Sequence, residues 1–394
     1  MKRSKLIQLL LVAISVVALA FVTSCEGPMG PAGPAGADGA DGTNGTDGTD
    51  GVAGNLSCLA CHTQEGMDAL QVLYDLSGHA SASTVAYAGG RASCARCHSS
   101  EGFANYLTSA PGVAAVDIAY PSKIRCSTCH SNHSSLEDGI SAPMVTTASV
   151  IGISDGTEFD FGNTSNLCGN CHQARRDGAS YDTYATAQTF TRKFSSATDI
   201  ATYTTAAFGP AGSSTLVVAG TAGSVADTLT VVFDVPTTHV YISSTHAGPH
   251  HGPQLNTLFG NGGYGTSSTH AHTDAGCVTC HMGTAGTTSG GHSFYANVEN
   301  CVTCHASATD FDINGKQTDF DTRMAAIGAA LEAKHAIHID ATTGEVHPLY
   351  ASIPRADFEA FWNYMVLYED FSHGVHNPSY FATLLAGAEA KLGL

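Results

Sequence analysis

The chain has 394 residues, enough for two or three domains, and although 43% of them are hydrophobic, only 13% are charged. Its 34 acidic and 16 basic residues give a formal net charge of −18. This balance makes nucleic acid and acidic membrane surfaces unfavourable partners and favours cationic proteins, metal ions or mineral surfaces.

The N-terminus predicts an export signal. Lys2, Arg3 and Lys5 are basic, residues 6–22 are almost continuously apolar, and small residues precede Cys25. This order is typical of a bacterial lipoprotein, in which residues 1–24 are removed and Cys25 is acylated; an uncleaved anchor and an ordinary signal peptide are the alternatives. Cleavage would remove three cations and no acids, taking the formal charge from −18 to −21. Because no second apolar run of spanning length follows, we expect attachment to the membrane by the lipid anchor.

Residues 25–57 are interpreted as the lipid anchor and a spacer. Glycine stands at every third position from residue 27 to residue 51, which is the period of a collagen triple helix. Proline occurs only in the first triplets, and Asp and Thr fill the later ones. A flexible acidic stalk is the alternative, and on either interpretation the segment is a spacer.

The pattern Cys-X-X-Cys-His occurs six times beyond the spacer. We number the copies motif 1 (residues 58–62), motif 2 (94–98), motif 3 (126–130), motif 4 (168–172), motif 5 (277–281) and motif 6 (301–305). In c-type haem attachment, the two thiols of such a motif bond the haem vinyl groups and its His ligates the iron as the proximal ligand. Zinc sites would not require His directly after the second Cys in every copy. The sequence therefore predicts six haem c groups.

The residues of these motifs account for all cysteines but one. The twelve cysteines predicted to bind haem are Cys58, Cys61, Cys94, Cys97, Cys126, Cys129, Cys168, Cys171, Cys277, Cys280, Cys301 and Cys304. The predicted proximal ligands are His62, His98, His130, His172, His281 and His305. The thirteenth cysteine is Cys25, so no cysteine remains for a disulfide.

The segments between the motifs are interpreted in chain order. Residues 58–180 form a four-haem region, in which apolar spacing over 65–76 predicts a helix ending just before His79. Residues 181–243 are a Ser/Thr-rich insert with β-branched runs that predict short strands at 215–218, 228–233 and 238–242.

Residues 244–394 form a two-haem region with His-rich loops and a helical C-terminal segment. A helix is predicted over 320–338, and Pro354 marks the start of another. Asn377 and Pro378 are the expected N-cap and first residue of the last helix.

The remaining histidines supply candidates for the sixth ligand of each iron. Six of the 20 histidines belong to the motifs, and a surplus of 14 favours two imidazoles per iron, an arrangement that carries electrons. The distal candidates are His79, His133, His250, His270, His292 and His376, with His246, His251 and His272 as alternates.

The six motifs together with residues 244–254, 277–282, 290–294 and 374–378 resemble multihaem c-type cytochromes of metal-respiring bacteria. That family includes outer-surface lipoproteins and hexahaem cytochromes that polymerise into extracellular filaments, and the resemblance covers most of residues 58–394. Residues 374–378 also resemble the C-terminal region of pentahaem nitrite reductases, where the matching His is a distal ligand, which supports His376. Those reductases hold one Lys-ligated haem, and this chain has no such motif.

The resemblance implies a haem-organised fold with little regular secondary structure: loops and short helices, a small β-rich insert and a helical C-terminus. It implies a non-enzymatic electron carrier that relays respiratory electrons to metal oxides, other cytochromes, outer-membrane electron conduits or partner cells. A reductase of a small oxyanion such as nitrite, with one open haem, and a filament or other homo-oligomer subunit are the alternatives. We expect an outer-membrane lipoprotein on the cell surface or the periplasmic face, or an extracellular protein.

Overall fold

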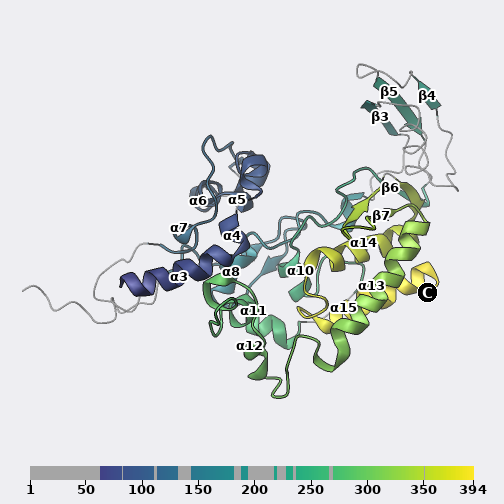
Figure 1. Cartoon of the computed structure of the whole chain (residues 1–394). Helices are drawn as coiled ribbons and strands as arrows, with labels where there is room; N and C mark the ends of the chain where they lie inside the picture. The colour runs from purple at the N-terminus through teal and green to yellow at the C-terminus, as the bar shows by residue number, and fades with distance from the viewer. Residues whose placement is uncertain are drawn as a thin grey trace, which may run out of the picture. The chain divides into compact units, whose positions relative to one another are not determined.

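The computed structural model describes most of the chain beyond motif 1. The described ranges are 63–81, 83–110, 113–131, 143–181, 237–265, 269–349 and 351–394, with the backbone alone of 188–193, 217–219 and 228–233. The chain divides into residues 1–54 and 55–394, and all described residues belong to the second unit. The predicted signal, lipidation site and spacer, motif 1 and His133 lie outside the described residues. The described part is mostly helices and loops with small sheets (Figure 1).

Short helices carry the first described motifs. They are α3 (Gln64–Leu76), α4 (Gly78–Ser81), η1 (Val85–Gly89, a π-helix), α5 (Ala92–His98), α6 (Ser100–Thr108), α7 (Cys126–Cys129), α8 (Ser165–Gly169) and the 3-10 turn η2 (Gly178–Tyr181). The predicted helix over 65–76 is confirmed as α3, whose N-cap Thr63 accepts a hydrogen bond from the Gly66 amide at 3.0 Å. Because α3 ends at Leu76, His79 falls in the separate turn α4.

Helical geometry explains the spacing inside each described motif. Positions i, i+3 and i+4 of a helix lie on one face, so a turn directs both thiols and the imidazole the same way. Motif 2 lies in α5 and motif 5 in α11 (Ala271–His281), while α7, α8 and α12 (Val298–Val302) begin or overlap the others. In motifs 3, 4 and 6, the His amide donates to the carbonyl of the first Cys at 2.7–3.0 Å. The sequence pattern is thus one turn of helix.

The described strands form four small antiparallel sheets. The strands are β1 (Val150–Ile151), β2 (Glu158–Phe159), β3 (Gln188–Lys193), β4 (Val217–Ala219), β5 (Thr228–Phe233), β6 (His239–Ile242), β7 (Ile337–Ile339), β8 (Val346–Pro348) and β9 (Ala351–Pro354). They pair as β1-β2, β3-β5-β4, β6-β9 and β7-β8. Strands β4, β5 and β6 confirm the predicted strand character of the insert. Strand β6 nevertheless pairs with β9, so the end of the insert joins the C-terminal core.

Three helices near the C-terminus enclose the main hydrophobic core (Figure 1). They are α13 (Lys316–Ala333), α14 (Arg355–Asp370) and α15 (Pro378–Leu392), preceded by the short elements α10 (Gln254–Leu258), α11, η3 (Gly291–Ser293), α12 and η4 (Ile313–Gly315). Helix α14 is buried on nearly all sides, and Trp362 at its centre donates to the Gly262 carbonyl at 2.7 Å. The predicted start at Pro354 and the Asn377 cap are confirmed.

The helix predicted over 320–338 has different bounds. It begins at Lys316 because the Asp312 carboxylate accepts from the amides of Gln317 and Thr318 at 2.7 and 3.2 Å. The predicted end is wrong, since α13 stops at Ala333, His335 adopts a φ of 56° and residues 337–339 form β7. Within the described ranges, no helix has the length and apolar character needed to cross a membrane.

Candidate haem-binding cavity

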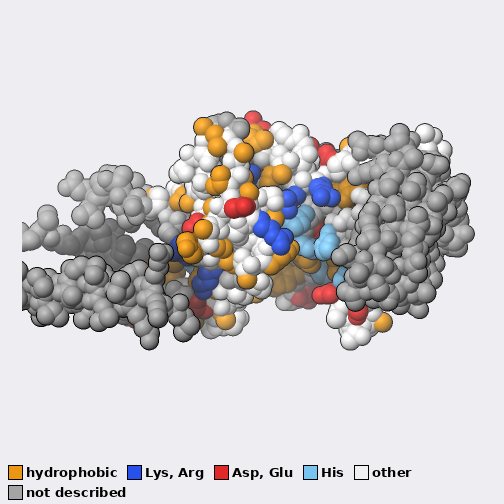
Figure 2. Space-filling view, turned by 90° about the horizontal axis from the view of Figure 1, so that it is seen from above, with side chains coloured by type: hydrophobic (Ala, Val, Ile, Leu, Met, Phe, Trp, Pro, Cys, Tyr) orange, Lys and Arg blue, Asp and Glu red, His pale blue; other side chains and the backbone are white. Residues whose placement is uncertain are grey.

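One continuous cavity of about 2060 Å³ is lined by residues from motifs 2 to 6. Both cysteines and the His of each of these five motifs face it. A site for one small ligand usually has about 300–1,000 Å³, so this cavity is large enough for several groups. Histidine side chains, with Lys and Arg beside them, are visible together in a hollow of the surface (Figure 2).

Each described motif His faces a second His that belongs to no motif. The pairs, with the distance between ring centroids, are His172 with His79 (6.1 Å), His98 with His250 (6.3 Å), His130 with His292 (6.1 Å), His281 with His376 (6.3 Å) and His305 with His272 (6.2 Å). All ten rings line the cavity. The partners are distant in sequence, so the tertiary fold alone brings them together.

The spacing within the pairs fits a metal ion between two imidazoles. Two rings on opposite sides of one metal have centroids about 6.3 Å apart, given metal–nitrogen bonds of about 2.0–2.1 Å. Two closer pairs, His250 with His251 at 5.4 Å and His270 with His272 at 4.9 Å, join near neighbours in sequence and are too close for this arrangement. The motif cysteines beside the rings suit covalent haem attachment. The residues present therefore fit haem c.

Four of the six predicted distal candidates belong to these pairs. His79, His250, His292 and His376 each lie opposite a motif His. Opposite His305 stands the alternate His272 rather than His270. His270 is instead the N-cap of α11, where its side chain accepts a hydrogen bond from the His272 amide at 3.3 Å.

The other two alternates lie outside the pairs. His251 also borders the cavity, with its Nδ1 atom 4.0 Å from a Glu369 carboxylate oxygen. His246 is exposed and contacts Thr245. Neither faces a motif His among the described residues.

Burial keeps several of the paired imidazoles neutral. It lowers the pKa of His79 and His250 to about 4, assisted by the charges of His172 and Arg175 respectively. Burial also lowers the pKa of four further paired rings, those of His98, His172, His281 and His292. Neutral imidazole is the form that ligates a metal, so these rings are ready ligands at neutral pH.

Hydrogen bonds to Nδ1 orient four of the rings through neutral groups. The partners are the Thr84 hydroxyl for His98 (3.0 Å), the Gln254 amide oxygen for His172 (3.3 Å), the Phe294 carbonyl for His281 (2.8 Å) and the Val375 carbonyl for His272 (2.6 Å). With Nδ1 bonded in this way, Nε2 of each ring remains to face a metal.

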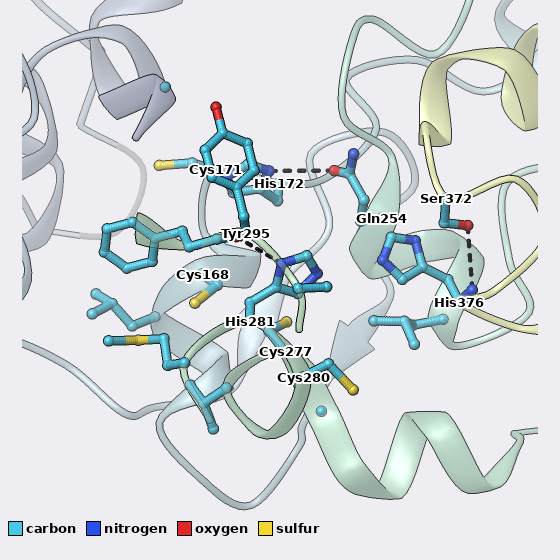
Figure 3. A pocket seen from close by; sticks show the side chains of 18 of the residues that line it. Cys168, Cys171, His172, Gln254, Cys277, Cys280, His281, Tyr295, Ser372 and His376 are labelled. Carbon is cyan, nitrogen blue, oxygen red and sulfur yellow. Dashed lines mark hydrogen bonds between the residues drawn. The ribbon is translucent and has the colours of Figure 1, made fainter. Parts of the chain in front are cut away.

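The ring of His376 differs, because its Nδ1 bonds the carboxylate of Asp370, with both oxygens at 2.9 Å. Figure 3 shows His376 and His281 on opposite sides of the pocket, with Cys277 and Cys280 beside His281. Sequence reasoning missed Asp370 and the ring partner Gln254. Gln254 lies within a segment that carried the family resemblance, but nothing in the sequence marks Asp370.

Neighbouring motifs contact one another. The Cys97 thiol donates to the Asn170 carbonyl at 3.9 Å and the Cys171 thiol donates to the Arg96 carbonyl at 3.8 Å, which joins motifs 2 and 4. The Val278 amide of motif 5 donates to the Ser165 hydroxyl at 3.3 Å, which joins motif 5 to α8, the helix in which motif 4 begins. Motifs 5 and 6 follow each other on the packed helices α11 and α12. The cavity therefore runs through motifs whose attachment points adjoin.

In the part of the chain that the structure describes, no three His, Cys, Asp or Glu side chains gather as a ready metal-ion site. The arrangement of the cavity is thus a series of ring pairs, with each pair flanked by two thiols.

Comparisons with known proteins give little further guidance. No protein-family model and no curated protein sequence matches the chain. Among solved structures, the crystal structure of the outer cell wall cytochrome OcwA aligns with a TM-score of 0.44 and 20% sequence identity. The alignment covers 81% of this chain and 49% of that one, so the present chain spans about half the length of that cytochrome.

Proposed function

We propose that this protein is an electron carrier that holds six covalently bound haem c groups, each ligated by two histidines. The observation that carries the proposal is the set of five ring pairs at 6.1–6.3 Å, one for each described motif. The sixth haem is proposed from motif 1 on its sequence alone, with Cys58, Cys61 and His62 as its residues.

Four side chains would hold the haem at each described motif. The two thiols would attach the macrocycle, and the motif His and the paired His would ligate the iron. The distal ligands that we propose are His79 for motif 4, His250 for motif 2, His292 for motif 3, His376 for motif 5 and His272 for motif 6. When bound, the haem iron supplies one-electron redox chemistry.

The protein's own part in electron transfer is to fix the haems close together. His272 and His281 both lie in α11, on either side of a kink at Gly276, so this short element would place one ligand of the motif 6 haem and one ligand of the motif 5 haem near each other. The contacts between motifs 2 and 4 and between α8 and motif 5 support attachment of neighbouring haems side by side. Close and fixed spacing is what a relay requires.

An oxyanion reductase is the less favoured alternative. Such an enzyme needs an iron with one open position for its substrate, whereas each of the five described motif histidines has a second His opposite. We therefore propose that the protein relays electrons and does not itself reduce a substrate at an open iron.

The export signal and the charge suggest where the relay works. A lipid on Cys25 would hold the protein at the outer membrane, and the spacer would extend the haem region from it. The formal charge of −18 favours cationic cytochromes, metal ions and mineral surfaces as donors or acceptors.

The test is to express the full chain with a cytochrome c maturation system and to measure its intact mass, its denaturing-gel haem stain and its electron paramagnetic resonance (EPR) spectrum. We expect six covalent haems and low-spin signals. A chain that carries fewer haems, or a large high-spin fraction that binds cyanide or nitrite, would contradict the proposal and favour the reductase.

A further inference from the structure

Asp370, the last residue of α14, holds its carboxylate against the ring of His376. The Asp370 side chain has no exposed surface, and both of its oxygens lie 2.9 Å from His376 Nδ1. The Ser372 amide donates to it at 3.1 Å, and the Thr257 hydroxyl also donates to it. The carboxylate is therefore fixed on three sides.

The hydrogen-bond partners of the other paired rings are uncharged. Nδ1 of the paired rings His98, His172, His281 and His272 bonds a hydroxyl, an amide oxygen or a backbone carbonyl. Among the described ring pairs, only that of His281 and His376 has a carboxylate as a hydrogen-bond partner. The haem of motif 5 is thus set apart from its neighbours.

The position of Asp370 is unfavourable for stability. The C-terminal end of a helix carries a partial negative charge, which disfavours an acidic side chain there. A buried carboxylate costs free energy unless it is paired and hydrogen-bonded. The hydrogen bonds from His376, Ser372 and Thr257 offset this cost, and their convergence beside the cavity points to a role at the ring.

We propose that Asp370 is a positioning residue that lowers the reduction potential of the haem held by motif 5 and His376. The inference rests on the proposed function, because it takes His376 as a ligand of that haem. A carboxylate that accepts the Nδ1 proton makes the imidazole a more basic ligand and fixes its orientation. A more basic ligand favours the oxidised, more positive iron over the reduced one.

The effect would make the reduction potentials of two adjacent haems differ. Gln254 donates to the Asp370 backbone carbonyl at 3.1 Å, and its amide oxygen lies 3.3 Å from His172 Nδ1 (Figure 3). One hydrogen-bonded chain thus places a neutral partner on the motif 4 ring and a charged partner on the distal ring of motif 5. We infer that the motif 5 haem has the lower potential of the two.

The test compares Asp370→Asn with Asp321→Asn in the full, haem-loaded chain. Asp321 is a matched control because its carboxylate bonds His373 Nδ1 at 2.6 Å, but His373 faces no motif His among the described residues. A redox titration followed by EPR measures the reduction potential of each haem. The low-spin signal that is lost in His376→Ala is the signal of the motif 5 haem. Loss of a ligand's hydrogen-bond partner changes metal affinity about 10–100-fold. We expect Asp370→Asn to make reduction of that haem about tenfold more favourable, a rise of about 59 mV for one electron, with no change in Asp321→Asn.

Thr257→Val provides a second test that keeps the carboxylate. Removal of the Thr257 hydroxyl leaves Asp370 a stronger acceptor for His376, so the same potential should fall, opposite in sign to Asp370→Asn. If Asp370→Asn does not fold, the sign of the potential shift in Thr257→Val decides whether Asp370 has this role. An unchanged potential in the folded variants, or a shift equal to that of Asp321→Asn, would overturn the role of Asp370. Failure of the unmodified chain to load haem would instead overturn the proposed function.

Discussion

Replacement of His272 by Ala tests the ligand assignment where the sequence and the structure differ most. The His272 ring lies 6.2 Å from that of His305, and its Nδ1 is fixed by the Val375 carbonyl at 2.6 Å. Without this imidazole, the iron of motif 6 loses one ligand and becomes high-spin. With six motifs in the chain, the loss should affect about one sixth of the haem iron.

His270→Ala is the matched control, only two residues away. His270 caps α11 through a hydrogen bond of 3.3 Å from the His272 amide, so its loss should cost roughly 0.5–1 kcal/mol of stability. We expect its iron spectrum to remain that of the unmodified protein. EPR spin quantification on the oxidised proteins, at matched haem content, measures the high-spin fraction in both.

The outcome separates the two histidines. A high-spin fraction near one sixth in His272→Ala and none in His270→Ala would support the assignment. Because the two rings are only 4.9 Å apart, His270 is close enough to replace a missing His272, and the double variant removes that route. A low-spin double variant, or a high-spin fraction in His270→Ala alone, would refute the reasoning.

Two further predictions concern the C-terminal core. Trp362→Ala should destabilise the protein by about 3–5 kcal/mol, because Trp362 has no exposed surface and bonds Gly262; a loss below 1 kcal/mol in denaturant unfolding would contradict this. Arg323→Met should cost about 1 kcal/mol near neutral pH, because the Arg323 guanidinium forms two hydrogen bonds with Glu389, linking α13 to α15. This pairing lowers the pKa of Glu389, so its stabilisation is present above the carboxylate's unfolded pKa and disappears as the pH falls through the folded pKa. A penalty for Arg323→Met that grows in acid would refute the ion pair's contribution.

Local sequence patterns predicted the elements of this fold well. The N-cap at Asn377 and the start of α14 after Pro354 follow from backbone chemistry that a few neighbouring residues supply. The helical turn in each described motif was not predicted, although it is consistent with the spacing of that motif. The end of α13 was predicted too late, because the pairing of β7 with β8 outweighs the helical preference of the residues after Ala333.

The pairing of the rings could not be predicted from the sequence. His292 lies between motifs 5 and 6 in the chain but faces His130 of motif 3, and His79 faces His172 of motif 4. The tertiary fold sets these contacts, and sequence distance carries no information about them. His270 was the predicted candidate and His272 only an alternate, and the ring pair of His272 with His305 and the cap geometry of α11 separate the two.

The central claim is that two histidines hold each iron, and the EPR spectrum of the oxidised, fully haem-loaded chain tests it most directly. We predict low-spin signals that account for all six haems, five of which correspond to the described ring pairs. A high-spin signal from one or more haems would contradict the account.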